Sequence, residues 1–442
     1  MTPPSLLTPR SLRASGTRAI PDRLLELHRA SGRLGPLLAW SVVFADIGTS
    51  IYYVPGLLFE ELGGRTPSPA APFVLATGLA FILLSLKYVE VSDRYPDGGG
   101  VVSVATDAFG PLIGCVGGIL ISVDYFLTGA ISAVSGFEYL STLFPSVGPL
   151  IVPYACCAIA FLGGLNMIGI RESATLTAFL AVSSLLINII VLITVGVQLD
   201  AAAWQTVWAQ FTSVRGLSAT PVLIGFASSW LAFSGLESIS QIAPALREPR
   251  RQTAFRAMML VVAGILITSP LMTAFETALL DANKVRPEQF LAALGGQYGP
   301  FALQVAIVAT ASTLLMGAAN TAIIGCYHVF LALVRLGFLP TWLAERSRRF
   351  NTPHRAIFIS VVVPIAVVVL SRGQMKLLGH LYAFGLLGAF TLTSMGLDRI
   401  RFQERKLTPG FYLGLITTGL VLTAFLVNLV HKHAATLFGG TV

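Results

Sequence analysis

The sequence predicts an all-α integral membrane protein with about 11 transmembrane helices. Three observations predict this class. Charged residues make up 11% of the chain and hydrophobic residues 55%, whereas about a quarter of the residues in a soluble domain are charged. Apolar runs of about 20 residues recur along the chain, and each is long enough to cross the hydrocarbon core as a helix. The Lys and Arg residues gather in alternate loops, which is typical of a membrane protein with a defined orientation.

The first 35 residues carry six arginines and contain no compact apolar core, so they lack the features of a cleavable signal peptide. We expect residues 1–35 to form a basic cytoplasmic tail. Residues 36–198 and 219–397 are expected to hold five spans each, and residues 398–442 an accessory span and a short C-terminus. The expected spans are 37–61, 70–92, 111–135, 149–170, 173–197, 220–245, 255–281, 301–333, 356–371, 376–397 and 410–431.

With the tail inside, about 22 of the 29 Lys and Arg residues fall on the cytoplasmic side, including a tight turn at Arg171. The formal charge of +8 is therefore a topology signal, and a nucleic-acid partner is not expected. An odd number of spans places the C-terminus outside. The four cysteines lie in apolar runs, which favours packing over a disulfide framework or a metal site.

Two spans are expected to be interrupted near the middle of the membrane. The first contains Gly48, Thr49 and Ser50, with Pro55 a turn later, and the sixth clusters serines around Ser234 and Gly235. Such backbone is tolerated only where it lines a cavity or is buried in protein. One break alone also fits a kinked helix packed on a neighbour. Two breaks at matching places predict inverted repeats of five helices, as in the LeuT fold, with a substrate site at the midplane.

Three acids fall at mid-membrane depth, namely Asp46, Asp124 and Glu237. A carboxylate there costs about 2.5–3.5 kcal/mol on insertion scales, so each acid is a functional hypothesis. Thr128 and Ser132 follow Asp124 at four-residue steps and share its helix face. Hydroxyl groups of this kind also often bond to their own backbone, and that interpretation stays open for both.

Two tyrosines complete the candidate set, Tyr53 after the first break and Tyr382 in the tenth span. Tyr382 also fits an interface anchor near a span end. Glu276 is expected to be an ordinary edge residue, because it lies near the outer end of the seventh span.

All of these candidate ligands are oxygens, which suit a hard, partly dehydrated cation such as potassium. Three carboxylates in a low dielectric cannot all stay ionised, so at least one is expected to hold a proton. A cation and a proton sharing these acids would make a cation–proton symporter. We therefore expect K⁺ as the substrate, H⁺ as the coupling ion and no cofactor.

Several segments resemble the amino acid–polyamine–organocation superfamily, among them FSGLESISQIAPALREPRR and DGGGVVSVATDAFG. The first span, VVFADIGTSIYY, is similar to the GDIGTSPLY motif of KUP-type potassium importers. The spacing of the candidate residues resembles that in KimA-type potassium importers, and the resemblance covers about residues 36–400. The family's potassium-binding acids, hydroxyls and tyrosines are matched by Asp46, Tyr53, Asp124, Thr128, Ser132, Ser234, Glu237 and Tyr382.

The resemblance implies proton-driven potassium uptake across the plasma membrane, with Glu237 as the proton-coupling residue. Backbone near Gly48, Thr49 and Gly235 would complete the cation path. The family usually has a twelfth span and a large cytoplasmic C-terminal domain, which helps to form a dimer and binds a nucleotide. This chain stops soon after its eleventh span, so a homodimer and nucleotide control stay open.

A permease for an amine, a polyamine or an amino acid is the alternative on the same scaffold. An organic ammonium group would also bind Asp46 and Asp124, and aromatic residues could wall such a pocket. The candidates for those walls are Phe44, Phe126, Trp230 and Phe233. An enzyme is not expected, because the two aspartates do not sit in a GxGD motif and no serine–histidine pairing is apparent.

Overall fold

The structure is a computed structural model that describes residues 34–169 and 174–432. The regular elements in these ranges are helices, apart from one isolated bridge between Leu34 and Leu246. Nearly all of the predicted basic tail and the predicted turn at Arg171 lie outside the described residues.

Eleven segments of the described ranges account for the predicted spans. Within the described ranges, nine segments are long and apolar enough to cross a membrane, and a bent pair of helices can make a tenth span. A shorter apolar helix of 17 residues, His354–Leu370, lies where the sequence predicts the remaining span. The first five are α2, η2 and α3 (Pro36–Ile47, Gly48–Tyr52, Val54–Glu61), α4 (Ala70–Arg94), α6 (Pro111–Leu143), η3 and α7 (Pro145–Leu150, Ile151–Ile168) and α8 (Ala174–Gln198). The second five are α10, η4 and α11 (Ala219–Ser229, Trp230–Phe233, Ser238–Gln241), α12 (Arg250–Leu279), α14 (Phe301–Arg335), α15 (His354–Leu370) and α16 (Met375–Gln403). The accessory span is α17 (Pro409–His431).

The third span is longer than its apolar run. The sequence predicts a span over 111–135, but α6 continues to Leu143 because polar residues such as Glu138 and Ser141 end the apolar run without breaking the helix. Its 33 residues reach about 50 Å. A helix of this length can extend beyond the hydrocarbon core and carry polar groups there.

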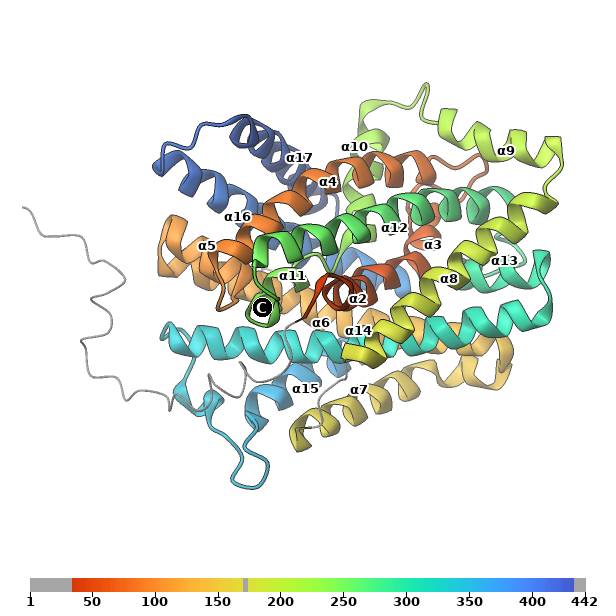
Figure 1. Cartoon of the computed structure of the whole chain (residues 1–442). Coiled ribbons are helices and arrows are strands. Elements are labelled where there is room, and N and C mark those ends of the chain that lie inside the picture. The colour runs from red at the N-terminus through yellow and green to blue at the C-terminus, as the bar shows by residue number, and fades with distance from the viewer. Residues whose placement is uncertain (1–33, 170–173, 433–442) are drawn as a thin grey trace, which may run out of the picture.

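Short helices connect the spans and were not expected from the sequence. Asp200 begins one of them, because its carboxylate accepts a hydrogen bond of 2.8 Å from the Ala203 amide. Figure 1 places α5 at one end of the bundle and α9 and α13 at the other. The connecting helices are α5 (Gly100–Phe109), α9 (Ala201–Thr212), η5 (Ala243–Ala245), η6 (Pro287–Gln289), α13 (Phe290–Tyr298) and η7 (Thr341–Ala344).

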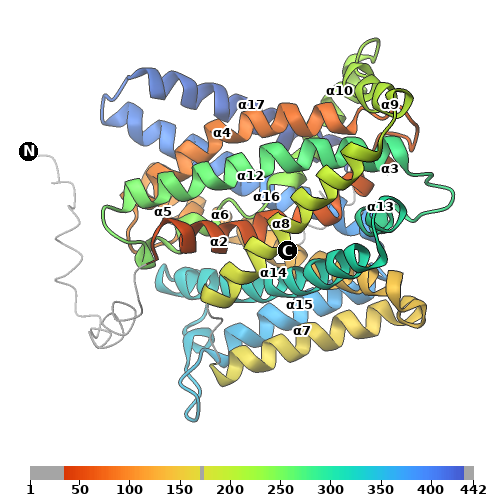
Figure 2. The ribbon, with the colours of Figure 1, turned by 45° about the vertical axis from the view of Figure 1, so that its right-hand side comes forward.

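The spans pack around α6, which contacts α14 along much of its length and also contacts α16. Close approach to α14 depends on small residues. Ser312 Oγ donates to the Gly136 carbonyl over 2.9 Å, and a Cβ at Gly325 would lie 2.7 Å from the Tyr125 ring. Figure 2 shows α7 beside α15 along one edge and α17 beside α16 along the opposite edge. The helix α6 therefore lies at the core of the bundle, packed against α14 and α16.

A buried ion pair joins α4 to α16 and α17. The Lys87 ammonium lies 2.8 Å from Asp398 Oδ2 and also donates to Ser394 and to Thr418 Oγ1. The Lys87 side chain is 2% exposed. An ammonium group so far from water is stable only because its donors are satisfied.

Asp398→Asn is expected to destabilise the protein by about 3–5 kcal/mol, because Lys87 would keep a buried charge without its carboxylate. The double variant Lys87→Met/Asp398→Leu should regain most of this loss, since an apolar pair leaves no charge unpaired. Thermal unfolding in detergent measures both effects. The matched control is Glu345→Gln, which removes an exposed pair with Arg355 at 2.8 Å and should cost under about 1 kcal/mol. Equal melting temperatures for Asp398→Asn and the control would contradict this account.

Candidate functional site

The first span is broken where the sequence predicts it. The helix α2 ends at Ile47, a 3-10 turn covers Gly48–Tyr52, and the chain bends by 42° before α3. Thr49 Oγ1 donates to the Asp46 carbonyl over 2.6 Å, which competes with the regular backbone hydrogen bonds of a helix. Ser50 Oγ lies 2.6 Å from the Ile47 carbonyl and 2.7 Å from the Ala232 carbonyl of the sixth span. Pro55 has no amide hydrogen to extend the ladder from α3.

The sixth span is broken at the matching place. After η4, Ser234 is extended and Gly235 has a φ of +101°, a conformation that glycine adopts readily. A Cβ at Gly235 would lie 2.8 Å from the Ile47 amide nitrogen and 2.9 Å from Asp46 Cγ. The two breaks therefore touch each other, and the prediction of discontinuous first and sixth helices is confirmed.

The three predicted acids are buried around this contact. The exposed fractions are 7% for Asp46, 0% for Asp124 and 4% for Glu237, and each lies within the electrostatic field of the other two. Ser238 Oγ donates to Asp46 Oδ2 over 2.5 Å. Within the described ranges, no donor group reaches either carboxylate oxygen of Asp124 or the Oε2 of Glu237. The carboxyl groups of Asp124 and Glu237 lie within hydrogen-bonding reach of each other. Buried acceptors without donors are costly, so this centre suits a proton or a cation.

A chain of hydroxyl groups lies beside the acids. Thr128 Oγ1 donates to the Tyr382 hydroxyl over 2.6 Å and lies 2.9 Å from the Asp124 carbonyl. The Tyr382 hydroxyl also hydrogen-bonds to Ser234 Oγ. This chain joins α6, α16 and the break in the sixth span. Tyr382 is 1% exposed, so it is a buried residue of this centre and not an interface anchor.

The remaining predicted residues lie around the same breaks. Tyr53 is 2% exposed and has Asp46 and Thr49 as electrostatic neighbours. A Cβ at Gly48 would lie 3.0 Å from the Phe44 ring, so this glycine also serves packing. Ser132 lies one turn beyond Thr128 on α6, and its buried hydroxyl has no hydrogen-bond partner in the part of the chain that the structure describes. That same part holds no group of three His, Cys, Asp or Glu side chains arranged for a metal ion.

Two residues of this region were not found from the sequence. Ser238, which binds Asp46, carries no signal beyond lying four residues after Ser234. Gly385 lets α16 approach α6, because a Cβ there would lie 2.6 Å from the Asp124 amide nitrogen. Away from this region, Glu276 lies three residues before the end of α12, near a span edge as expected, and it is buried there, with 1% exposed.

A sequence model of the amino acid permease family matches residues 37–441. The chain belongs to this family. It is 29% identical over 380 residues to the potassium transporter KimA of Bacillus subtilis, covering 83% of this chain and 61% of KimA. It is 24% identical over 380 residues to the vacuolar cationic amino acid transporter 4 of Arabidopsis thaliana, covering 81% and 61%.

The fold is also shared with solved transporters. A crystal structure of the Eremococcus coleocola manganese transporter, in complex with an aromatic bis-isothiourea compound, superposes with a TM-score of 0.62 at 13% identity. The match covers 92% of this chain and 89% of the other. The relatives and the fold are those of membrane transporters, not of enzymes. The chain spans about three fifths of the length of the curated relatives it matches.

Proposed function

We propose that the protein imports potassium across the plasma membrane by proton symport. The observation that carries this proposal is the cluster of three buried carboxylates beside the Thr128–Tyr382–Ser234 hydroxyl chain. A dehydrated K⁺ ion takes oxygen ligands, and carboxylate, hydroxyl and unwound carbonyl oxygens are all available here. The ion would bind Asp46, Tyr53, Asp124, Thr128 and Ser132.

The proton is required by the charge balance of the same centre. One monovalent cation neutralises one carboxylate, and the two others repel each other in a low dielectric. Binding a proton at one of them removes that repulsion. Glu237 suits this role best because it lies directly after the break at Gly235, on a segment that would move during transport. The ligand set needs no cofactor.

The four-helix bundle of α2–α3, α4, α10–α11 and α12 is the proposed moving part. These elements contact one another, and they carry Asp46 and Glu237. Asp124 and Tyr382 lie outside the bundle, on α6 and α16. Rocking of the bundle would therefore open and close the site between its two sets of ligands.

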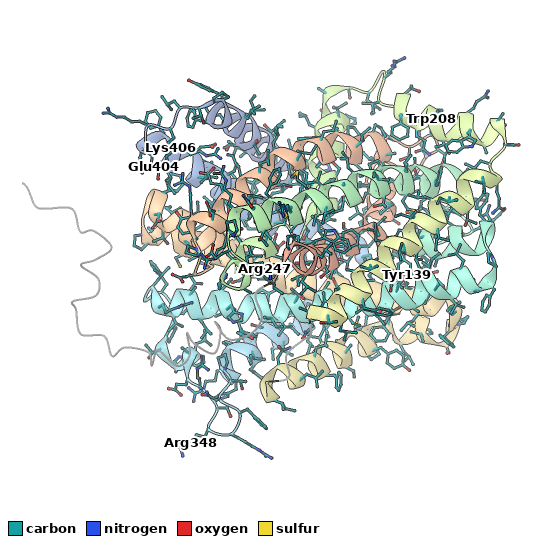
Figure 3. All side chains as sticks on the ribbon, in the orientation of Figure 1. Tyr139, Trp208, Arg247, Arg348, Glu404 and Lys406 are labelled. Carbon is teal, nitrogen blue, oxygen red and sulfur yellow. The ribbon has the colours of Figure 1, made fainter. Side chains whose placement is uncertain are left out.

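The proposed orientation follows from the basic loops. Figure 3 shows Arg348 and Lys406 at one end of the bundle and Trp208 at the opposite end. The end with the arginine-rich loops would face the cytoplasm, with the N-terminus on that side. Membrane lipid and a small cation are the partners we expect, a homodimer stays open, and a nucleic-acid partner is not expected.

A permease for amines or cationic amino acids is the second candidate, favoured by the relative from Arabidopsis thaliana. The structure supports this candidate less well, because the aromatic rings that would wall a pocket for an organic substrate pack against other rings. Phe233 lies 4.9 Å from Phe81 between ring centroids, and Phe126 lies 6.1 Å from Phe330. The other two also pack in pairs, Phe44 with Trp40 and Trp230 with Phe226.

Rubidium uptake into liposomes containing the purified protein tests the proposal. We expect saturable uptake that an inward proton gradient accelerates, that K⁺ inhibits, and that excess lysine or putrescine leaves unchanged. A proton ionophore should remove the acceleration, which controls for leak. Uptake of labelled lysine or putrescine without rubidium flux would contradict the proposal and favour a permease for amines or cationic amino acids.

A further inference from the structure

A second site lies at the end of the bundle that carries the basic loops. A cavity of about 530 Å³ lies between α4, α12 and the connection from α16 to α17. One part of its lining is apolar and faces outward, with Leu86 40% and Phe255 45% exposed. The other part is basic and includes Arg251 and Lys406. The cavity is therefore divided into an apolar half and a charged half.

The acid of the lining is already neutralised. Glu90 lies 2.5 Å from Arg401 and 2.7 Å from Arg94 through its two carboxylate oxygens. Arg251, in contrast, is exposed and has no acid partner within the described residues. In the part of the chain that the structure describes, the acid partner of Lys406 is Glu404, in an exposed contact of 2.9 Å. The charged half thus carries a surplus of positive charge.

The depth of these residues matches the headgroup region. Arg251 is the second residue of α12, and Lys406 lies in the short connection just beyond the end of α16. Both are therefore at the ends of membrane spans, while Leu86 and Phe255 lie one to two turns further into the bilayer. Figure 3 shows Lys406 at the same end of the molecule as Arg348.

We propose that this cavity binds an anionic phospholipid from the surrounding leaflet. The phosphate of the headgroup would lie between Arg251 and Lys406, and an acyl chain would pack along Phe255 and Leu86. Basic pockets between membrane helices favour anionic headgroups, because the charge attraction adds to burial of the chain. The binding does not depend on which substrate the transporter carries, so it can fail or hold independently of the proposed potassium uptake.

Native mass spectrometry of the purified protein, titrated with phosphatidylglycerol at low ionic strength, tests the proposal. Each basic residue near an anionic surface contributes about fivefold in affinity. Arg251→Gln/Lys406→Gln is therefore expected to weaken binding about 25-fold, and Arg251→Gln alone about fivefold. The matched control is Arg348→Gln/Arg349→Gln, which removes the same charge from an exposed loop at the same end and should leave this binding unchanged.

Three outcomes would overturn the proposal. The first is equal affinity of the wild type and the double pocket variant, with equal melting temperatures. The second is equal binding of zwitterionic phosphatidylcholine. The third is displacement of the lipid by millimolar inorganic phosphate, which would assign the cavity to a free anion. The single variant keeps the test valid if the double variant unfolds, because the Arg251 side chain is exposed.

Discussion

Asp124→Asn is expected to abolish rubidium uptake while the protein stays folded in the membrane. The Asp124 side chain is fully buried, no donor group within the described residues reaches its carboxylate oxygens, and the group within hydrogen-bonding reach is the carboxyl of Glu237. A unit charge about 4 Å from a monovalent cation contributes about 4 kcal/mol at an intermediate dielectric, or about a thousandfold in affinity. The amide keeps the shape of the side chain and removes this charge.

The stability of this variant separates a transport role from a structural one. If Asp124 only supported the fold, asparagine would lower both the melting temperature and the uptake. If it binds the cation, the melting temperature should stay unchanged or rise, because a buried carboxylate without donors has been removed. Asp281→Asn is the control, since it removes an acid from the loop after α12, where the side chain is 47% exposed. Uptake by Asp124→Asn within about twofold of wild type would remove Asp124 from the proposed site.

The sequence predicts the spans and the breaks well because both depend on local composition. Apolar runs must become helices in a bilayer, and glycine with serine or threonine at mid-depth weakens a helix wherever the chain is placed. This is why the break at Gly48 and the break at Gly235 could both be located before the structure was known. Their contact with each other could also be expected, because breaks in two repeats meet at the midplane.

The contacts that depend on lateral packing could not be predicted. Lys87 and Asp398 are 311 residues apart, and nothing in either local sequence indicates the other. Glu276 lies near a span end, where depth suggests exposure, yet neighbouring helices bury it. The surroundings of Tyr382 also could not be predicted from its position in a span. Its depth in the tenth span fitted an anchor as well as a cation ligand, and the hydrogen bond with Thr128 places its hydroxyl in the buried centre, away from a membrane interface.

Gly235→Ala is expected to destabilise the protein by about 2–6 kcal/mol and to remove uptake. Alanine at a positive φ costs about 1–3 kcal/mol. The added methyl group would also lie 2.8 Å from the Ile47 amide nitrogen, a backbone atom that cannot rotate away, and overpacking of this kind costs about 1–3 kcal/mol more. Melting temperature and rubidium uptake are the two measurements.

Substitutions at two other glycines separate the effect of backbone strain from the effect of the steric clash. Gly63 has a φ of +94° with nothing within 4 Å of its Cβ position, so Gly63→Ala has the strain without the clash. Gly419 lies within α17 with open space around it, so Gly419→Ala has neither and should be neutral or slightly stabilising. Uptake should survive in both. If Gly63→Ala lost as much stability as Gly235→Ala, backbone strain alone would explain the effect. A larger loss at Gly235, accompanied by loss of uptake, is expected because the break of the sixth span must lie directly against Asp46 for the two halves of the site to meet.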